Sequence, residues 1–220
     1  MKILIADDHP LFRDALCRAV QGLYPNAEIK DAASVAALQQ LLETHADADL
    51  LLLDLHMPGA SGFSALVHIR ASWPSLPVVV ISGNEEPGVM QRAIGHGASG
   101  YIPKASDPAQ MAAAISAVLD GDIWLPPGVG SDGKLAPDEA DIARRVRELT
   151  PHQFRVLMML ADGLLNKQIA YELGVSEATV KAHMTAVMKK LGVSNRTQAV
   201  VAAARLQLDP SMRLPALEDE

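Results

Sequence analysis

Short aliphatic runs alternate with stretches of helix length over the first half of this 220-residue chain. The runs Lys2–Ala6, Leu50–Asp54 and Pro77–Ile81 are bounded by acidic residues, Gly or Pro, as buried parallel strands are, and Glu28–Ala32 and Gly100–Pro103 are two further strand candidates. This alternation predicts an α/β fold with a doubly wound, five-stranded parallel sheet. Because crossovers between parallel strands are right-handed, the carboxyl ends of the strands meet at one edge, where such sheets place their sites.

The stretches between these runs predict five helices. They are Leu11–Leu23, Val35–Glu43, Phe63–Ser72, Gly88–His96 and Ala109–Leu119. Asp107 and Pro108 open the last of them as an N-cap and a first-turn proline. Beyond Gly121 the alternation stops, and the Pro and Gly residues of 124–134 indicate a linker. Within 138–149 acidic residues come first and arginines last, which is the order that a helix dipole favours, so we expect a short linker helix there.

The remaining chain predicts helices only. Thr150 with Pro151, Ser176 and Asn195 are typical first residues of helices, and glycines at 163, 174 and 192 end the segments between them. The predicted division of the chain is an α/β domain over 1–120, a linker over 121–148, a small all-α four-helix domain over 149–208 and an acidic tail over 209–220.

Charge divides the chain in a similar way. The net charge is −7, which taken whole argues against a nucleic-acid partner. Residues 1–125, however, hold seven Lys/Arg against fourteen Asp/Glu, whereas residues 149–208 hold seven against three, a net charge of +4. Such an asymmetry indicates two halves with different tasks.

Several classes of protein are disfavoured by simple counts. The single cysteine, Cys17, excludes a disulfide framework and a cysteine-based zinc site, and suits a reducing cytosol. The longest apolar runs are far shorter than the roughly 20 residues that span a bilayer. Asp7 and Asp8 stand where a signal peptide needs an apolar core. We therefore expect a cytoplasmic protein that makes no membrane contact.

Acidic, hydroxyl and ammonium groups follow the predicted strands at their carboxyl ends. Asp7 and Asp8 end the first strand, Asp54 ends the third, Ser82 follows the fourth and Lys104 follows the fifth. Three crowded carboxylates repel one another and invite a divalent cation with oxygen ligands, most plausibly Mg²⁺. With a hydroxyl donor and a lysine beside them, the group suits a phosphoryl ligand and an aspartate nucleophile. Singly, each residue has an ordinary structural explanation, such as a cap, a turn or a surface lysine; the combination favours a site.

These positions and their neighbours resemble the receiver domain of bacterial two-component response regulators over residues 2 to about 120. The resemblance rests on Asp7-Asp8-His9, the segment 53–59 (LDLHMPG), Ile81-Ser82-Gly83 and the segment 97–104 (GASGYIPK). It implies a flavodoxin-like fold in which Asp54 is the phosphoacceptor. Asp8 and Asp54 would hold Mg²⁺ by carboxylates, His56 by its backbone carbonyl and Asp7 largely through water. Ser82 and Tyr101 would be the switch pair, and Lys104 would pair with the aspartyl phosphate.

Two positions depart from the common receiver pattern, and one motif is a decoy. Ser82 replaces the more frequent Thr, and His56 stands two residues after the acceptor, where an apolar residue is frequent. Together with Asn84, His56 is a candidate to alter the rate at which water attacks the acyl phosphate. The segment 95–100 (GHGASG) matches a dinucleotide fingerprint, but it ends a helix and leads into a strand, which is the reverse of the order that this motif requires.

Residues 166–185 predict helix, glycine-containing turn and helix, as in a helix-turn-helix. The second helix carries polar and basic residues suited to a major groove, with the flanking lysines on phosphates. A plain helical hairpin with a solvated lysine face is the alternative. The candidate DNA contacts from this pattern are Ser176, Thr179, Lys181, His183, Met184 and Lys189.

Residues 149–208 are similar to the LuxR-type DNA-binding domain, so the whole chain resembles the NarL/FixJ class of response regulators. The matching segments are 149–151 (LTP), 161–164 (ADGL), 166–170 (NKQIA), 179–183 (TVKAH) and 190–199 (KLGVSNRTQA). The resemblance implies that Val180 and Lys181 face bases in double-stranded DNA. It also implies that the DNA backbone or groove is contacted by Asn166, Lys167, Thr179 and His183. The helix Arg196–Leu206 would form the contact of a homodimer. The resemblance further implies that the unphosphorylated receiver covers the recognition helix.

The expected function is a transcription factor switched by phosphorylation of Asp54, with a sensor histidine kinase as the phosphoryl donor. The receiver would catalyse only its own phosphotransfer and dephosphorylation and would not be an enzyme otherwise. Two alternatives remain open. One is a constitutive DNA-binding regulator with a degenerate receiver, and the other is an aspartate-nucleophile phosphatase, for which a substrate cap and a second acid at position 56 are lacking.

Overall fold

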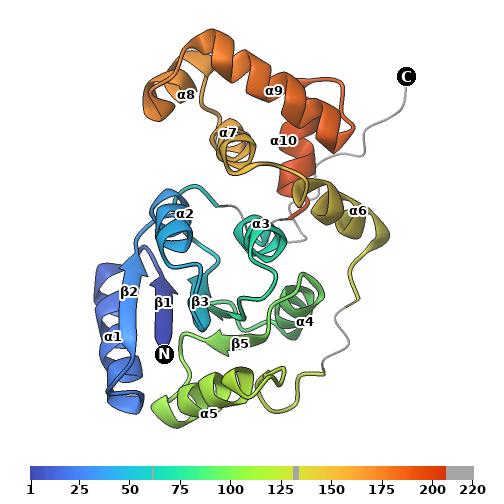
Figure 1. The fold of residues 1–220 in the computed structure, drawn as a ribbon. Helices are drawn as coiled ribbons and strands as arrows, with labels where there is room; N and C mark the ends of the chain where they lie inside the picture. Colours follow the sequence, from blue (N-terminus) through green and yellow to red (C-terminus); the bar gives the residue numbers. More distant parts are fainter. Residues whose placement is uncertain (61, 131–133, 207–220) are drawn as a thin grey trace.

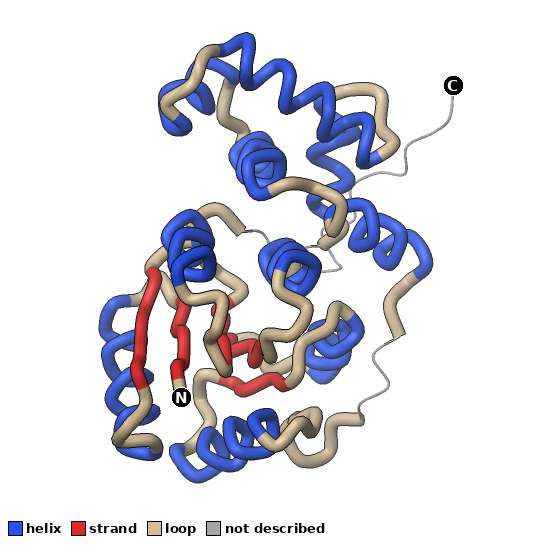
Figure 2. Tube along the Cα trace, in the orientation of Figure 1, coloured by secondary structure: helices blue, strands red, loops and turns tan. Residues whose placement is uncertain are grey.

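A computed structural model describes residues 1–60, 62–130 and 134–206 of the chain. The predicted tail over 209–220 lies outside the described residues. The first half forms one parallel sheet with the strand order β2-β1-β3-β4-β5, as the alternation predicts (Figure 2). The strands are β1 (Lys2–Ala6), β2 (Glu28–Ala32), β3 (Leu50–Asp54), β4 (Val78–Ser82) and β5 (Gly100–Pro103).

Alternate residues of each strand face two helical layers, because successive side chains of a strand point to opposite sides. Ile3 and Ile5 of β1 pack with α1 (Pro10–Leu23) and α5 (Pro108–Leu119), whereas Leu4 faces the other layer. That second layer consists of α2 (Val35–Thr44), α3 (Ser64–Ser72) and α4 (Pro87–Gly95) (Figure 1). Burial on both faces explains why the central strands β3 and β4 are apolar along their length until they end in Asp54 and Ser82.

The segment after α5 does not leave the sheet at once. Trp124 bridges to Gly100, its N–H donates to Ser99 O at 3.1 Å, and its carbonyl accepts the N–H of Tyr101 at 3.1 Å. Residues just beyond 120, which the sequence assigns to the linker, therefore extend the edge of the sheet beside β5. The predicted linker helix is present as α6 (Pro137–Val146).

Four helices follow: α7 (Pro151–Ala161), α8 (Asn166–Leu173), α9 (Glu177–Leu191) and α10 (Arg196–Ala204). The predicted caps are confirmed, since the side chains of Thr150, Ser176 and Asn195 each accept a hydrogen bond from the backbone of the first turn. Gly174 and Gly192 end α8 and α9 in the left-handed conformation that favours glycine. No helix in the described part of the chain is both long and apolar enough to cross a bilayer.

The two halves meet through α3. The ring of His68 stacks on the ring of Phe154 in α7, with 4.3 Å between centroids and planes 1° apart. The Ser64 hydroxyl lies 3.3 Å from the Met158 sulfur, and the N–H of Phe63 donates to the carbonyl of Leu206 at 2.7 Å. Because α3 lies between the sheet and the helical domain, residues 64–69 are all buried. The apolar cores of the two halves are thus continuous.

Candidate phosphoacceptor site and DNA-reading helix

The predicted acidic group comes together at the carboxyl edge of the sheet. Asp7 and Asp54 are each 1% exposed, and Asp8 is partly exposed beside them. Ligand atoms of Asp7, Asp8, His9 and Asp54 all lie within 4.8 Å of one another. Asp7 follows β1 and Asp54 ends β3, two strands that are neighbours in the sheet. The parallel topology therefore creates this pocket from residues almost 50 positions apart.

Lys104 forms ion pairs with both buried carboxylates. Its Nζ lies 2.7 Å from Asp7 Oδ2 and 2.8 Å from Asp54 Oδ2, and 4.6 Å above the ring of Phe12. Partial burial alone would lower the pKa of Lys104, but the hydrogen bonds to Asp54 and Asp7 outweigh it and raise the pKa above its ordinary value. The ammonium therefore stays charged across the physiological range.

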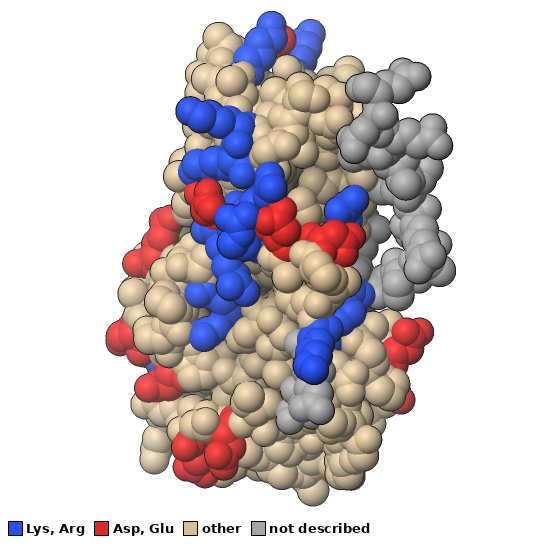
Figure 3. Space-filling view, turned by 90° about the vertical axis from the view of Figure 1, so that its right-hand side faces the viewer, with Lys and Arg blue, Asp and Glu red and all other residues tan. Residues whose placement is uncertain are grey.

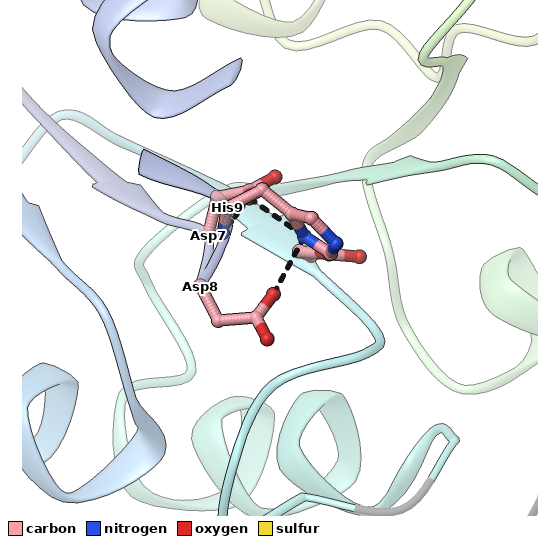
Figure 4. Close-up of side chains that lie close together, drawn as sticks. Asp7, Asp8 and His9 are labelled. Atoms are coloured by element: carbon pink, nitrogen blue, oxygen red, sulfur yellow. Dashed lines mark hydrogen bonds and ion pairs between the residues drawn. The ribbon is translucent and has the colours of Figure 1, made fainter. Parts of the chain in front are cut away.

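The remaining oxygens of the pocket suit a divalent cation. Asp7 Oδ2 and Asp8 Oδ1 are both buried, and a nitrogen lies close to each of them: Lys104 Nζ is 2.7 Å from Asp7 Oδ2, and His9 Nδ1 is 2.8 Å from Asp8 Oδ1. Hard carboxylate oxygens in this state fit Mg²⁺, which prefers such ligands. In Figure 4 the imidazole of His9 points toward the carboxylates, and its Nδ1 is 2.8 Å from Asp8 Oδ1. The sequence reasoning gave His9 no role.

His56 lies at the mouth of the pocket. Its N–H donates to Asp54 Oδ1 at 3.1 Å, and its imidazole Nδ1 is 3.9 Å from the same oxygen while the side chain is 59% exposed. The imidazole is thus close to the acceptor and open to water.

Ser82 and Tyr101 are connected through the backbone of Asn84. The N–H of Asn84 donates to Ser82 Oγ at 3.3 Å, and the Tyr101 hydroxyl donates to the carbonyl of Asn84 at 2.6 Å. Both switch candidates are fully buried. Burial, opposed by a hydrogen bond to Ser82 and reinforced by the charge of Asp54, raises the pKa of Tyr101 to about 12. The loop between β4 and α4 therefore contacts both predicted switch residues.

In the helical half, α9 presents one face to the core and one to solvent. Val180, Met184, Val187 and Leu191 are buried, at the spacing of successive helical turns. Lys181 and Lys189 are exposed, as are Lys167 on α8 and the cap residue Ser176. Asn166, Thr179 and His183 are half-buried.

Two of the predicted DNA contacts, the base-facing candidate Val180 and the further candidate Met184, have buried side chains. Val180 is 0% exposed and Met184 is 7% exposed, because both side chains fill the space between α9 and the other helices of the domain. Besides Lys181 and Lys189, the exposed face of α9 carries Glu177, Ala178, Ala182 and Thr185. Glu177, Ala178, Ala182 and Thr185 are not among the predicted DNA contacts. The helical spacing of Val180, Met184, Val187 and Leu191 was sufficient to identify the buried face, and with it the exposed one.

The receiver does not cover α9 in this structure, contrary to the expected arrangement. Helix α7 lies between α3 and α9 (Figure 1), and in the described part of the chain the receiver is contacted by α6, α7 and Leu206. The exposed face of α9 is therefore open. The carbonyl of Leu206, at the end of the segment expected to form the dimer contact, is instead bonded to the N–H of Phe63.

Comparisons with known proteins agree with both halves. Residues 3–116 match the response regulator receiver domain, and residues 147–203 match the luxR family of bacterial regulatory proteins. The glycerol metabolism activator of Pseudomonas putida is 40% identical over 218 residues, which are 96% of this chain and 99% of that protein. The nitrate/nitrite response regulator NarL of Escherichia coli K12 is 32% identical, over 90% of this chain and 93% of its own.

Solved structures show the same organisation. RcsB of Salmonella enterica serovar Typhimurium, bound to a promoter in the presence of the phosphomimetic BeF3−, is 26% identical with a TM-score of 0.55, over 94% of this chain and 99% of its own. The chain therefore belongs to the NarL/FixJ class of two-component response regulators, in which a receiver domain precedes a LuxR-type DNA-binding domain.

Proposed function

We propose that phosphorylation of Asp54 by a sensor histidine kinase controls the binding of this response regulator to promoter DNA. The observation that supports it is the pairing of one lysine, Lys104, with two buried carboxylates, Asp7 and Asp54, at the edge of the sheet. When the Asp54 carboxylate becomes an acyl phosphate, the ammonium of Lys104 can stay beside Asp54 and pair with a phosphoryl oxygen. In this proposal the chain consists of a receiver over 1–120, a linker over 121–148 and a DNA-binding domain over 149–208.

In the proposed reaction a carboxylate oxygen of Asp54 attacks the phosphorus of a phosphohistidine, and the bond from phosphorus to the imidazole nitrogen breaks. Asp7, Asp8, Asp54 and the backbone carbonyl of His56 are the proposed Mg²⁺ ligands. Bound Mg²⁺ would neutralise part of the negative charge on the transferring group. Ser82 would donate its hydroxyl to a phosphoryl oxygen, and a movement of its Oγ toward that oxygen would lengthen the bond that Oγ accepts from the N–H of Asn84. Tyr101, bonded to the same residue, would then change its position.

The proposed DNA-binding surface is the exposed face of α9. Lys181 is the base-reading candidate, and Lys167, Ser176, Lys189 and the half-buried Asn166, Thr179 and His183 are the candidates for backbone or groove contacts. Figure 3 shows Lys and Arg side chains over the DNA-binding half and further down past the middle of the molecule, where acidic side chains lie among them, and more acidic side chains lower down. We place the protein in the cytoplasm, active as a homodimer on two half-sites of double-stranded DNA.

Lys181→Ala tests the DNA-reading face. We expect about tenfold weaker binding to the specific site and a flatter sequence preference, because a side chain that contacts base edges contributes about 1–2 kcal/mol of discrimination. The measurement is a footprint and a titration on the DNA upstream of the protein's own gene. Lys189→Ala is the matched control: it removes the same charge and should weaken binding to all sequences alike. Unchanged site selection in Lys181→Ala would contradict this placement of the reading helix.

His56→Leu tests the role of the imidazole beside the acceptor. We expect the aspartyl phosphate to last about tenfold longer, because an imidazole open to water near Asp54 can accept a proton from the attacking water. Release of labelled phosphate over time measures the lifetime. Asn84→Ala is the comparison, since the Asn84 side chain accepts the N–H of Glu86 at 2.8 Å and is thus engaged within its loop. An unchanged lifetime in His56→Leu would end the idea.

A further inference from the structure

The linker helix α6 contacts the receiver at its first turn. Glu139, only 7% exposed, receives hydrogen bonds from Arg92 Nε at 2.9 Å and from Arg92 Nη2 at 2.8 Å, and its Oε1 lies 2.6 Å from His96 Nε2. Arg92 belongs to α4, and His96 directly follows it. Phe63 packs against both partners, with its ring 4.8 Å from the His96 ring and 4.9 Å from the Arg92 guanidinium carbon.

This contact is ionic although it is largely enclosed. Burial alone would raise the pKa of Glu139, but the hydrogen bonds from His96 and Arg92 lower it below its ordinary value. The carboxylate is therefore charged at neutral pH. A charge in such a place is costly once its partners move away, so the contact responds sharply to the position of α4.

The other end of α6 contacts the DNA-reading helix. Arg145 Nη1 donates to the carbonyl of Leu191, the last residue of α9, at 2.6 Å, and Asp141 holds the Nε of Arg145 at 2.8 Å. The guanidinium packs closely on Gly192, where a Cβ would lie 1.8 Å from Arg145 Nη1, so a side chain at position 192 would displace it. Lys190 Nζ adds a bond to the carbonyl of Glu148 at 2.7 Å. A guanidinium at a helix carboxyl terminus also suits the helix dipole.

Within the receiver, the switch residues Ser82 and Tyr101 are connected to the start of α4. Asn84 contacts both Ser82 and Tyr101, and its side chain accepts the N–H of Glu86, which is the N-cap residue of α4. Any movement of Ser82 toward a phosphoryl group therefore changes the bonding of the residue that fixes the start of α4.

We propose that α6 is the relay between the two halves: α4 holds it through Glu139, and it holds the carboxyl end of α9 through Arg145. This inference rests on the proposed function. The exposed face of α9 is open, so the receiver does not control DNA binding by covering this helix. It controls the position of α9, which α6 holds at its carboxyl end. Phosphorylation shifts α4, the Glu139 contact loosens, and α9 and its domain are released to adopt the DNA-bound arrangement.

The test compares DNA affinity with and without phosphodonor for the full chain, together with intact-mass measurement of phosphoryl incorporation. In Glu139→Gln, which keeps the shape and removes the charge, the unphosphorylated protein should bind its site about tenfold more tightly, while phosphorylated affinity and incorporation stay as in wild type. The matched control is Asp138→Asn on the same turn, where the exposed carboxylate pairs with Arg205 at the surface. It should behave as wild type.

Arg145→Met tests the other end of the relay without altering the Glu139 contact. It should also reduce the ratio of phosphorylated to unphosphorylated affinity. The relay is refuted if either variant keeps the wild-type ratio of phosphorylated to unphosphorylated DNA affinity. In that case the phosphorylation switch itself still stands. If the wild type itself is phosphorylated but shows a ratio of one, the switch and the relay fall together.

Discussion

Asp54→Asn should abolish covalent phosphorylation and, with it, any response of DNA binding to a phosphodonor. An amide is a poor nucleophile and cannot form the acyl phosphate. Among the described carboxylates, only Asp54 and Asp7 pair with Lys104. Intact-mass measurement after treatment with a small phosphodonor and Mg²⁺ gives a yes-or-no result. DNA titration should then give the same affinity with and without phosphodonor.

The control for this result is Asp47→Asn. Asp47 is exposed and paired with Lys2 at 2.8 Å, before the start of β3, at the edge of the sheet opposite to Asp54. It should be phosphorylated as wild type is. Phosphate on Asp54→Asn would mean that another residue, with Asp7 as the first candidate, accepts the phosphoryl group. Failure of the wild type to take up phosphate would favour a constitutive DNA-binding regulator instead, and turnover of an external phosphoester would favour a phosphatase.

The sheet could be predicted from sequence because a strand buried on both faces needs an unbroken apolar run. Four of the five strands have the predicted ends. The fourth was predicted over Pro77–Ile81 and is shifted by one residue, to Val78–Ser82. Proline has no N–H for the ladder, so Pro77 contributes only its carbonyl, which accepts the N–H of Leu51 at 3.0 Å. The site followed from the strands, since parallel topology by itself brings Asp7, Asp54 and Lys104 together.

The contact between the halves could not be predicted in this way. A helical pattern shows which residues are buried but not which partner buries them, and Glu139 looks like an ordinary first-turn acid of an exposed helix. His68 likewise lies in a predicted helix without any signal of its burial against Phe154. Val180 and Met184 have separate explanations. Val180 was carried over from the family motif, and Met184 was assigned to the exposed side of its helix, whereas both lie on the buried face with Val187 and Leu191.

Acidification should weaken this structure through His68, by about 2 kcal/mol at pH 5 and about 3 kcal/mol at pH 4 relative to pH 7. The side chain is 1% exposed, neither ring nitrogen has a hydrogen-bond partner among the described residues, and burial lowers the pKa of His68 from 6.5 to about 4. When α3 separates from α7 or unfolds, the imidazole regains its ordinary pKa and binds a proton below pH 6.5. While His68 is buried against Phe154, it does not bind this proton until about pH 4. The stability of the folded protein therefore falls as the pH is lowered from about 6.5 to about 4.

His68→Phe isolates this effect from the carboxylates that titrate over the same range. A phenyl ring can stack on Phe154 as the imidazole does, but it neither titrates nor leaves two nitrogens without partners, which also costs stability at neutral pH. Urea denaturation at pH 7, 6 and 5 should show a smaller loss of stability on acidification in His68→Phe than in wild type. His152→Phe, which removes an exposed imidazole from the first turn of α7, should follow the wild-type curve. Parallel curves for His68→Phe and wild type would show that His68 is open to solvent, and that the stacked contact between α3 and α7 does not persist in solution.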